Sequence, residues 1–351
     1  MRVTVHDVAR LAGVSTKTVS RVVNRQGEIS EATRARVQAA IDQLGYRPNL
    51  LARGLVSRRS HMIGVVAWGI DYYGPSRVIV GIEAKAHQLG YTLFLSLIPH
   101  PGDARVDILD TLISHRVDGI IWMIPEVGSN QDWISSISQD DLPPLVCING
   151  NARPGLVSVS IDNRQGGFVA TQHLIEQGRR RIGLISGPEN WWEAEERSRG
   201  WQQALEGAGI GSASTCISAT EWSIQAGADA MQSLLKRHPG IDALFAESDH
   251  IALGALHVLL RSGRKVPGDV ALVGFDDIPE SSYFQPPLST VHQPLSDLGE
   301  AAVEHLVDLI GQRRRGESPH TRRPASREPY LIVRASSSAA GGWKKMRPTH
   351  P

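Results

Sequence analysis

The chain has 351 residues, enough for two or three domains of about 100–200 residues each. Its hydrophobic content of 41% is ordinary for a globular protein, and no apolar run approaches the ~20 residues of a membrane-spanning helix. Two cysteines, Cys147 and Cys216, are too few for a disulfide framework or a cysteine-based metal cluster. Because the N-terminus also lacks the apolar core of a secretory signal, the sequence predicts a cytoplasmic protein with no membrane partner.

Charge is distributed unevenly along the chain. Residues 1–60 contain eleven Lys and Arg against four Asp and Glu, whereas the remainder carries a net charge of −6. A basic segment on an acidic body predicts a polyanionic partner, such as nucleic acid, for the first sixty residues alone. Charge by itself does not distinguish this from a merely solvated basic segment.

Three short helices are predicted in the basic segment. The spacing of apolar residues indicates helices over residues 4–12, 15–24 and 30–45. Each begins at a hydroxyl residue suited to cap a helix, and the first and third end at a glycine. The capping residues are Thr4, Ser15 and Ser30, and the glycines are Gly13 and Gly45.

Two short helices joined by a tight turn, with a third packed across them, form a helix-turn-helix motif whose second helix enters the DNA major groove. In that arrangement Thr16 and Lys17 face base edges, and Arg21 faces a base edge or a phosphate. Ser15 and Ser20 suit phosphate contacts. A purely structural helical trio is the alternative. The candidate DNA-binding residues of this segment are Thr4, Ser15, Thr16, Lys17, Thr18, Ser20, Arg21 and Asn24.

Five segments, in order along the chain, carry a resemblance to a known family: "VTVHDVARLAGVSTKTVSRVVN", "NLLARGL", "SDHIALGAL", "VALVGFDDIPES" and "PPLSTVHQPL". They are similar to segments of the lactose/galactose-repressor (LacI/GalR) family of bacterial transcription regulators, and the resemblance extends to about Ser336. It implies a DNA-binding repressor that recognises a palindromic operator as a homodimer. It also implies control by a small-molecule effector; whether the effector releases DNA or enables binding is not readable from the sequence.

The resemblance also implies the domain organisation. It predicts an all-α helix-turn-helix headpiece and a hinge helix, followed by a periplasmic-binding-protein-like α/β core of two doubly wound lobes. The chain would cross between the lobes near Ile161, Thr290 and Pro324. The tail lacks apolar heptads, so no C-terminal tetramerisation bundle is expected. The expected boundaries are 1–47 for the headpiece, 48–60 for the hinge, 61–161 with 291–323 for the N-terminal lobe, 162–290 with 324–337 for the C-terminal lobe, and 338–351 for a disordered tail.

The segment 48–60 has two interpretations. From its residues alone it is a basic, flexible linker, because a helix over residues 49–57 has only about two turns and is marginal in isolation. The resemblance implies a hinge helix that folds on DNA in the minor groove, with Leu55 wedged between base pairs. Gly54 departs from the bulkier residue common there and weakens the helix. The candidate contacts are Asn49, Ala52, Arg53 and Leu55.

After His61 the pattern changes to near-continuous apolar runs separated by amphipathic segments. This alternation is typical of buried parallel strands with crossover helices, and it predicts a doubly wound α/β arrangement long enough for two units. The predicted strands are 62–68, 91–98, 117–124, 144–150, 181–187, 241–248 and 270–277, and the predicted helices include 78–89, 164–177 and 251–261.

Ligands of open α/β sheets bind beyond the carboxyl ends of the strands. There Arg197, Asp276 and Trp222 supply bidentate donors, a carboxylate that accepts hydroxyls and a flat apolar wall, a combination suited to a sugar. These three match the family's effector pocket most strongly. The candidate effector-binding residues are Tyr72, Tyr73, Pro75, Asn149, Arg197, Trp222, Ser248, Asp249, Asp276 and Gln293.

Each principal candidate has a structural alternative. Asp276 or Asp277 can cap a turn, Arg197 can pair with Glu193 on its own helix, and Trp222 can be ordinary packing. The role of the adjacent pair Trp191 and Trp192, whether lining a cleft or closing its rim, stays open.

The effector class also has an alternative. Aromatic residues such as Tyr72 and Tyr73 stack a nucleobase in the purine-repressor branch of the family, although the aromatic, Arg and acidic groups favour a saccharide. No P-loop, nucleophile elbow, HExxH motif or Cys/His cluster is found, so neither catalysis nor a metal or cofactor is predicted. A periplasmic sugar-binding protein would share the core but has no use for the headpiece.

Overall fold

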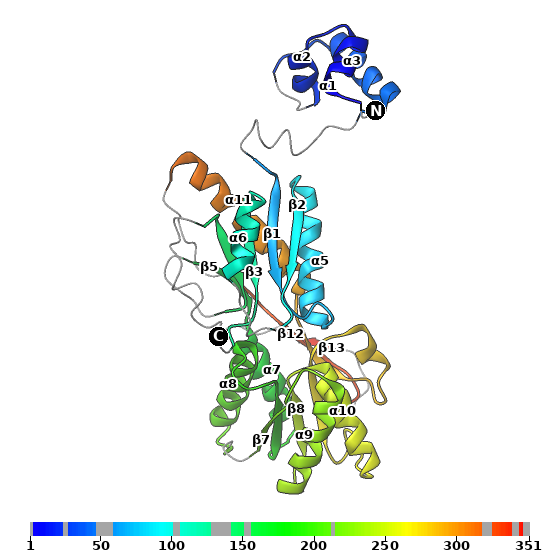
Figure 1. Ribbon diagram of the computed structural model, residues 1–351. Helices are drawn as coiled ribbons and strands as arrows, with labels where there is room; N and C mark the ends of the chain where they lie inside the picture. Colours follow the sequence, from blue (N-terminus) through cyan, green and yellow to red (C-terminus); the bar gives the residue numbers. More distant parts are fainter. Residues whose placement is uncertain are drawn as a thin grey trace. The chain divides into compact units, whose positions relative to one another are not determined.

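The computed structural model describes residues 3–23, 27–46, 59–100, 106–127, 142–150, 156–211, 215–317, 325–338 and 344–346. The chain divides into two compact units, residues 1–61 and residues 62–351, which are described separately below (Figure 1). Among the described helices, none has both the length and the apolar character needed to cross a bilayer.

The first unit contains three helices around a small apolar core. The predictions of all three are confirmed: α1 spans Val5–Ala12, α2 spans Thr16–Val23 and α3 spans Glu31–Leu44. Val8, Val19 and Val37 are each fully buried, one from each helix, and hold the three together.

Local hydrogen bonds set the helix starts in this unit. The backbone N and the Oγ1 of Thr4 both donate to Asp7 Oδ2, at 3.0 and 2.7 Å. Ser15 Oγ accepts the backbone N–H of Thr18 at 3.1 Å and so caps α2. Between these helices Gly13 has φ 64°, the left-handed conformation that lets the chain turn sharply into α2.

The second unit contains two mainly parallel sheets, one in each lobe. The sheet of the N-terminal lobe has the order β11-β5-β4-β3-β1-β2, with every pairing parallel. Helices α5 and α11 pack on one face of it and α6 on the other. Its elements are β1 Met62–Ala67, α5 Tyr73–Gln88, β2 Thr92–Leu97, α6 Val106–Ser114, β3 Gly119–Met123, β4 Leu145–Ile148, β5 Val157–Ile161, α11 Leu295–Arg315 and β11 Ala325–Arg327.

The sheet of the C-terminal lobe has the order β13-β12-β10-β9-β8-β6-β7, parallel except where β12 pairs with β10 and β13. Strands β6, β8 and β9 of this sheet are almost completely buried, whereas the edge strand β7 is largely exposed. Its elements are α7 Asn163–Glu176, β6 Ile182–Ser186, α8 Trp192–Gly207, β7 Cys216–Ser218, α9 Ile224–Arg237, β8 Ala243–Ala246, α10 Asp249–Arg261, β9 Ala271–Asp276, the 3-10 helix Pro279–Tyr283, β10 Ser289–His292, β12 Tyr330–Val333 and β13 Lys344–Met346.

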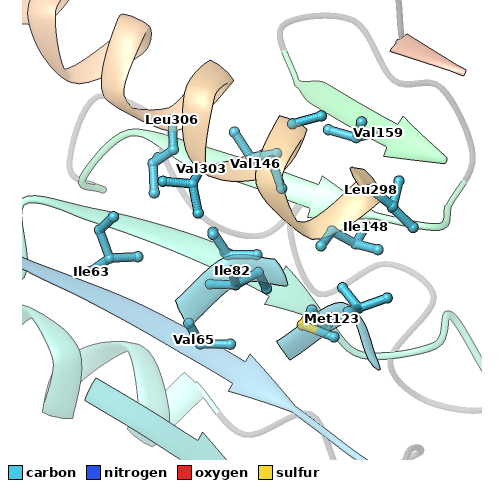
Figure 2. Packing of buried hydrophobic residues seen from close by; sticks show 14 of the residues in the cluster. Ile63, Val65, Ile82, Met123, Val146, Ile148, Val159, Leu298, Val303 and Leu306 are labelled. Atoms are coloured by element: carbon cyan, nitrogen blue, oxygen red, sulfur yellow. The ribbon is translucent and has the colours of Figure 1, made fainter. Parts of the chain in front are cut away.

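All seven predicted strands are present, and the near-continuous burial of β3, β6 and β8 explains why their apolar runs were recognisable. The N-terminal lobe shows the resulting core: branched side chains of the sheet interdigitate with those of α5 and α11 (Figure 2). Six strands were not predicted. They are short, as in the three residues of β7, or mix serine with apolar residues, as in β5.

The chain passes between the lobes three times. The first passage follows Ile161 at the end of β5. The second follows His292, because β10 stays paired with β9 through that residue, which is slightly later than the expected Thr290. The third follows Arg327, because β11 still pairs with β5 of the N-terminal lobe, which is slightly later than the expected Pro324.

The C-terminal tail differs from the expectation of a disordered segment. Residues Lys344–Met346 form β13, which pairs antiparallel with β12. Without this addition β12 would be an edge strand with unpaired backbone groups, and an edge accepts almost any short extended segment, whatever its hydrophobicity.

Three helix pairs cross with their backbones in direct contact, and each crossing uses a reciprocal pair of glycines. Between α7 and α8, a Cβ on Gly167 would lie 2.1 Å from the carbonyl oxygen of Arg197, and one on Gly200 would lie 2.0 Å from that of Arg164. The same pattern occurs between α5 and α11 and between α9 and α10. No side chain fits at these positions, so the glycines fix the distance between the helices.

We therefore expect Gly200→Ala to lower the free energy of unfolding by about 1–3 kcal/mol, because the methyl group forces α7 and α8 apart. Gly207→Ala, on the same helix, is the control: nothing lies within 4 Å of its Cβ, so the variant should be neutral or up to ~1 kcal/mol more stable. Urea unfolding of the two variants tests this, and equal midpoints would contradict the role given to the crossing.

Candidate functional site

The first unit presents one helix face free of acidic residues. On α2 the side chains of Lys17, Ser20 and Arg21 are exposed and those of Thr16 and Thr18 are half-buried, while the valines turn inward. Exposed basic and hydroxyl groups on one short helix suit the phosphates and base edges of nucleic acid.

Three of the predicted DNA contacts already take part in local hydrogen bonds. The Thr4 hydroxyl donates to Asp7 at the start of α1, and the Ser15 hydroxyl, which caps α2, lies 2.9 Å from Thr18 Oγ1. All three hydroxyls stay near the surface. The remaining DNA-binding candidates, Asn24, Asn49, Ala52, Arg53 and Leu55, lie outside the described residues and stay predictions.

In the second unit a cleft of about 900 Å³, part of it open to solvent, lies between the lobes. It brings together nine of the ten predicted effector-binding residues, which come from the ends of strands and the starts of helices in both lobes. These nine are Tyr72, Tyr73, Pro75, Asn149, Arg197, Trp222, Ser248, Asp276 and Gln293. Trp191, whose role the sequence left open, also lines the cleft. The other lining residues, which were not among the candidates, are Trp68, Gly74, Val78, Met123, Pro125, Ile148, Glu193, His250 and Leu295.

The tenth candidate, Asp249, does not line the cleft. Its side chain is fully buried, with Oδ1 accepting a hydrogen bond from Thr290 Oγ1 at 2.6 Å and Oδ2 one from the Ile278 backbone at 2.9 Å. Its two oxygens therefore connect α10 to β10 and to the turn after β9, and the structure does not place Asp249 among the residues that line the cleft. Burial, followed by the nearby charge of Asp276, raises the pKa of Asp249 well above its usual value.

Arg197 lies on α8 and is only 6% exposed. Its Nε donates to Asn163 Oδ1 at 2.8 Å and its Nη1 donates to the backbone carbonyl of Glu247 at 2.6 Å. The guanidinium lies 3.9 Å from the centroid of the Phe275 ring and 5.5 Å from that of Trp222. These contacts fix the plane of the guanidinium where Arg197 lines the cleft. No ion pair with Glu193 is formed among the described residues.

Asp276 ends β9 and faces the cleft. Its φ of 120° belongs to the region that favours glycine, and such strained conformations persist where the surroundings enforce them. Gln293 Nε2 donates to its Oδ1 at 2.7 Å. Burial raises the pKa of Asp276 to about 6, against the opposing charge of Arg197. The group therefore accepts hydroxyl hydrogen bonds as a carboxylate at neutral pH.

The neighbouring Asp277 turns away from the cleft. It accepts hydrogen bonds from Arg334 Nη2 at 2.8 Å and from His292 Nδ1 at 3.0 Å. Burial opposes ionisation, but these two bonds outweigh it and hold the pKa of Asp277 below its usual range. Asp277 is thus a structural residue that braces the strained strand end.

Two carboxyl groups near Arg197 were missed because a single glutamate in a sequence gives no sign of its burial. Glu247 is fully buried, and its side chain accepts hydrogen bonds from the Gly187 backbone and from Ser198 Oγ, each at 2.8 Å. Burial raises the pKa of Glu247 to about 8. Glu193 lines the cleft, where burial likewise raises its pKa although Asn149 donates a hydrogen bond to it.

Four aromatic rings form a continuous series along the cleft. The ring centroids of Tyr72 and Trp68 are 5.3 Å apart, those of Trp68 and Trp191 also 5.3 Å, and those of Trp191 and Trp222 6.0 Å. The series therefore runs from the N-terminal lobe to the C-terminal lobe. The structure assigns different positions to the two adjacent tryptophans: Trp191 lines the cleft, and Trp192 begins α8 outside it.

Among the described residues there is no group of three or more His, Cys, Asp or Glu side chains placed to hold a metal ion. The arrangement of the cleft is one of hydrogen-bond donors and acceptors at one end and apolar rings along its length.

Comparison with known proteins gives two family matches. Residues 4–49 match the family described as bacterial regulatory proteins, lacI family, and residues 171–337 match the periplasmic binding protein-like domain. The PurR repressor of Photobacterium profundum is 32% identical over 334 residues, covering 95% of this chain and 98% of the relative. The ribose operon repressor of Escherichia coli K12 is 35% identical over 310 residues, covering 88% and 93%.

Solved structures of two transcription regulators also superpose on nearly the whole of this chain. The Lac repressor dimer bound to operator and an anti-inducer superposes with a TM-score of 0.85 at 29% identity, covering 97% of this chain and all of that one. The transcriptional regulator CelR in complex with cellobiose has a TM-score of 0.70 at 32% identity, covering 96% and 100%.

The raised pKa of Glu247 predicts a pH-dependent stability. Between about pH 5 and pH 8 the folded protein keeps a proton on Glu247 that the unfolded chain releases, so the free energy of unfolding falls as the pH rises through this range. Glu247→Gln, which keeps the size of the side chain, should make this slope shallower. Part of the slope remains, because burial also raises the pKa of Asp276.

Urea unfolding at several pH values between 5 and 8 measures the slope. Glu206→Gln, on the exposed end of α8, is the control and should leave the slope as in the unaltered chain. Identical slopes for all three proteins would contradict the protonated state of Glu247.

Proposed function

The chain belongs to the lacI family of bacterial regulatory proteins and is a DNA-binding transcriptional repressor rather than an enzyme, and we propose that a saccharide held between its two lobes controls its affinity for a palindromic operator. The observation that carries this proposal is the convergence of Arg197, Asp276 and Trp222 in one cleft. A planar donor, a carboxylate acceptor and an indole face match the hydroxyls and the apolar C–H face of a sugar ring.

The charges of the cleft favour a neutral ligand. Asp276, a carboxylate at neutral pH, offsets the charge of the Arg197 guanidinium, so a phosphorylated ligand would find no unbalanced positive charge there. Among the relatives, one is named the ribose operon repressor and one is solved in complex with cellobiose. A nucleobase stacked on Tyr72 or Tyr73 is the alternative that the binding experiments below distinguish.

For operator recognition we assign α2 as the helix that enters the major groove. Its exposed Lys17 and Arg21 then lie near base edges and phosphates, with Thr16 at the N-terminal end of the helix. A palindromic site needs two such helices, so the repressor acts as a homodimer, as the Lac repressor neighbour does on its operator. It works in the cytoplasm, where the chromosome is located.

The control mechanism follows from the position of the cleft. A ligand that contacts both lobes favours the arrangement in which those contacts are made, and the resulting movement of the N-terminal lobes changes the spacing of the two DNA-binding units in the dimer. Operator affinity then depends on ligand concentration through the difference in ligand affinity between the two arrangements.

Lys17→Ala should change base preference within each half-site, because a residue that reads base edges loses about 1–3 kcal/mol of discrimination when it is removed. Arg36→Ala removes one positive charge from the exposed face of α3 and serves as the control, with unchanged preference. Competition binding against a library of half-site variants, starting from an operator selected from random DNA, measures both. An equal loss of affinity across all sequences for Lys17→Ala would assign the residue to phosphate contact instead.

Arg197→Ala should abolish the effect of the ligand on operator binding and leave operator affinity without ligand within about threefold. Arg199→Ala, two residues along α8, removes an exposed guanidinium that pairs with Glu195 and Glu196, and should respond normally. Because Arg197 is buried, Asp276→Asn provides a second cleft variant of nearly unchanged shape. A normal response in both cleft variants would place the ligand elsewhere.

A further inference from the structure

Resting on the proposed function, we propose that the effector is a saccharide of at least two sugar rings, and that Trp191 and Trp68 form the subsite for its second ring. The family assignment does not supply this subsite; it follows from the extent of the cleft and from the groups that line its outer part.

The first observation is the length of the aromatic series. Of the four rings in this series, Trp222 is the one beside Arg197, with the guanidinium 5.5 Å from its ring centroid. The series then continues by 6.0 Å to Trp191 and by 5.3 Å to Trp68, away from the polar groups that would hold the first ring. A single sugar ring between Arg197, Asp276 and Trp222 would leave these two indoles without a ligand contact, whereas a second ring would cover them.

The second observation is that both indoles are held in place. Trp68 donates its Nε1–H to the backbone carbonyl of Pro99 at 3.3 Å, so its polar atom is satisfied by the protein and its ring is fixed. Trp191, the residue immediately before α8, packs its ring against those of Trp68 and Trp222, with centroids 5.3 and 6.0 Å apart. Rings that are already ordered lose little conformational entropy when a ligand stacks on them.

The third observation is an unsatisfied acceptor in the cleft. Asn149 Oδ1 is buried and makes no hydrogen bond among the described residues, while the amide of the same side chain donates to Glu193. A buried carbonyl without a donor is costly, so this site calls for a donor from outside the protein. The hydroxyls of a sugar supply such donors, and Glu193 offers a further acceptor beside it.

The length of the aromatic series and the unpaired acceptor thus both fit a saccharide longer than one ring.

Calorimetric titration of the full-length protein tests the proposal. The panel contains glucose, galactose, mannose, xylose and ribose, the α- and β-linked disaccharides of the hexoses and xylose, and hypoxanthine and guanine. We expect at least one disaccharide to bind tenfold or more tightly than either of its component monosaccharides. For that disaccharide, Trp191→Ala should weaken binding at least tenfold, as is typical when an indole platform is removed.

Trp192→Ala is the matched control, since it removes the adjacent indole outside the cleft and should change affinity less than twofold. Trp191→Phe keeps a smaller ring and should give an intermediate affinity. Affinity for the component monosaccharide should be the same in all variants. Thermal melts confirm that each variant is folded.

The outcomes separate this inference from the function on which it rests. Two results would overturn the subsite for a second ring: tight binding of a monosaccharide with no gain from a second ring, or equal losses of affinity in Trp191→Ala and Trp192→Ala. Neither result would contradict control of the repressor by a saccharide. Binding of a nucleobase alone, or of no member of the panel, would overturn both.

Discussion

The close crossing of α7 and α8 is the constraint on which the ligand cleft depends. Gly167 allows the backbone of α7 to touch the carbonyl of Arg197, so the two helices meet at the level of the residue that dominates the cleft. From α7, Asn163 then reaches Arg197 Nε at 2.8 Å. A wider spacing between the helices would break that bond and remove one hydrogen bond from a buried cation, a loss of about 1.5–3 kcal/mol.

The rest of the C-terminal lobe supports the same cation. Phe275 from β9 lies under the guanidinium at 3.9 Å, and the backbone carbonyl of Glu247 at the end of β8 accepts from Nη1. Glu247 in turn holds the Gly187 backbone with its side chain, and a Cβ at Gly187 would lie 2.1 Å from the Trp222 ring. The indole wall of the cleft and its cation are therefore placed by one buried network. Preorganisation of this kind limits the entropy lost when a ligand binds.

The strained strand ends are held by a second buried network. Asp276 and Asp277 have φ values of 120° and 56°, which cost energy for residues other than glycine. The ion pair between Asp277 and Arg334 connects this turn to β12, and the hydrogen bond with His292 connects it to the last residue of β10. Both strands adjoin passages between the lobes. The position of the Asp276 carboxylate therefore depends on two strands, β10 and β12, that lie next to the segments passing between the lobes.

Much of this arrangement was predictable from the sequence, for reasons that also explain the failures. Buried parallel strands such as β3 and β8 give unbroken apolar runs, and helix caps such as Ser15 carry their own local signal. Edge strands have no such signal, because β13 forms only by pairing with β12. Position at a strand end predicted Arg197 and Asp276 correctly as cleft residues. The same criterion misplaced Asp249, since the direction of a side chain depends on contacts such as that with Thr290 that are distant in sequence.

The contacts that join the two lobes across the cleft lie where a ligand would bind. The ring contact between Trp68 and Trp191 and the hydrogen bond from Asn149 to Glu193 each connect one lobe to the other. A ligand that stacks on both indoles and bonds to Asn149 stabilises only the arrangement in which the lobes close around it. This difference in stability shifts the equilibrium between the two arrangements of the repressor.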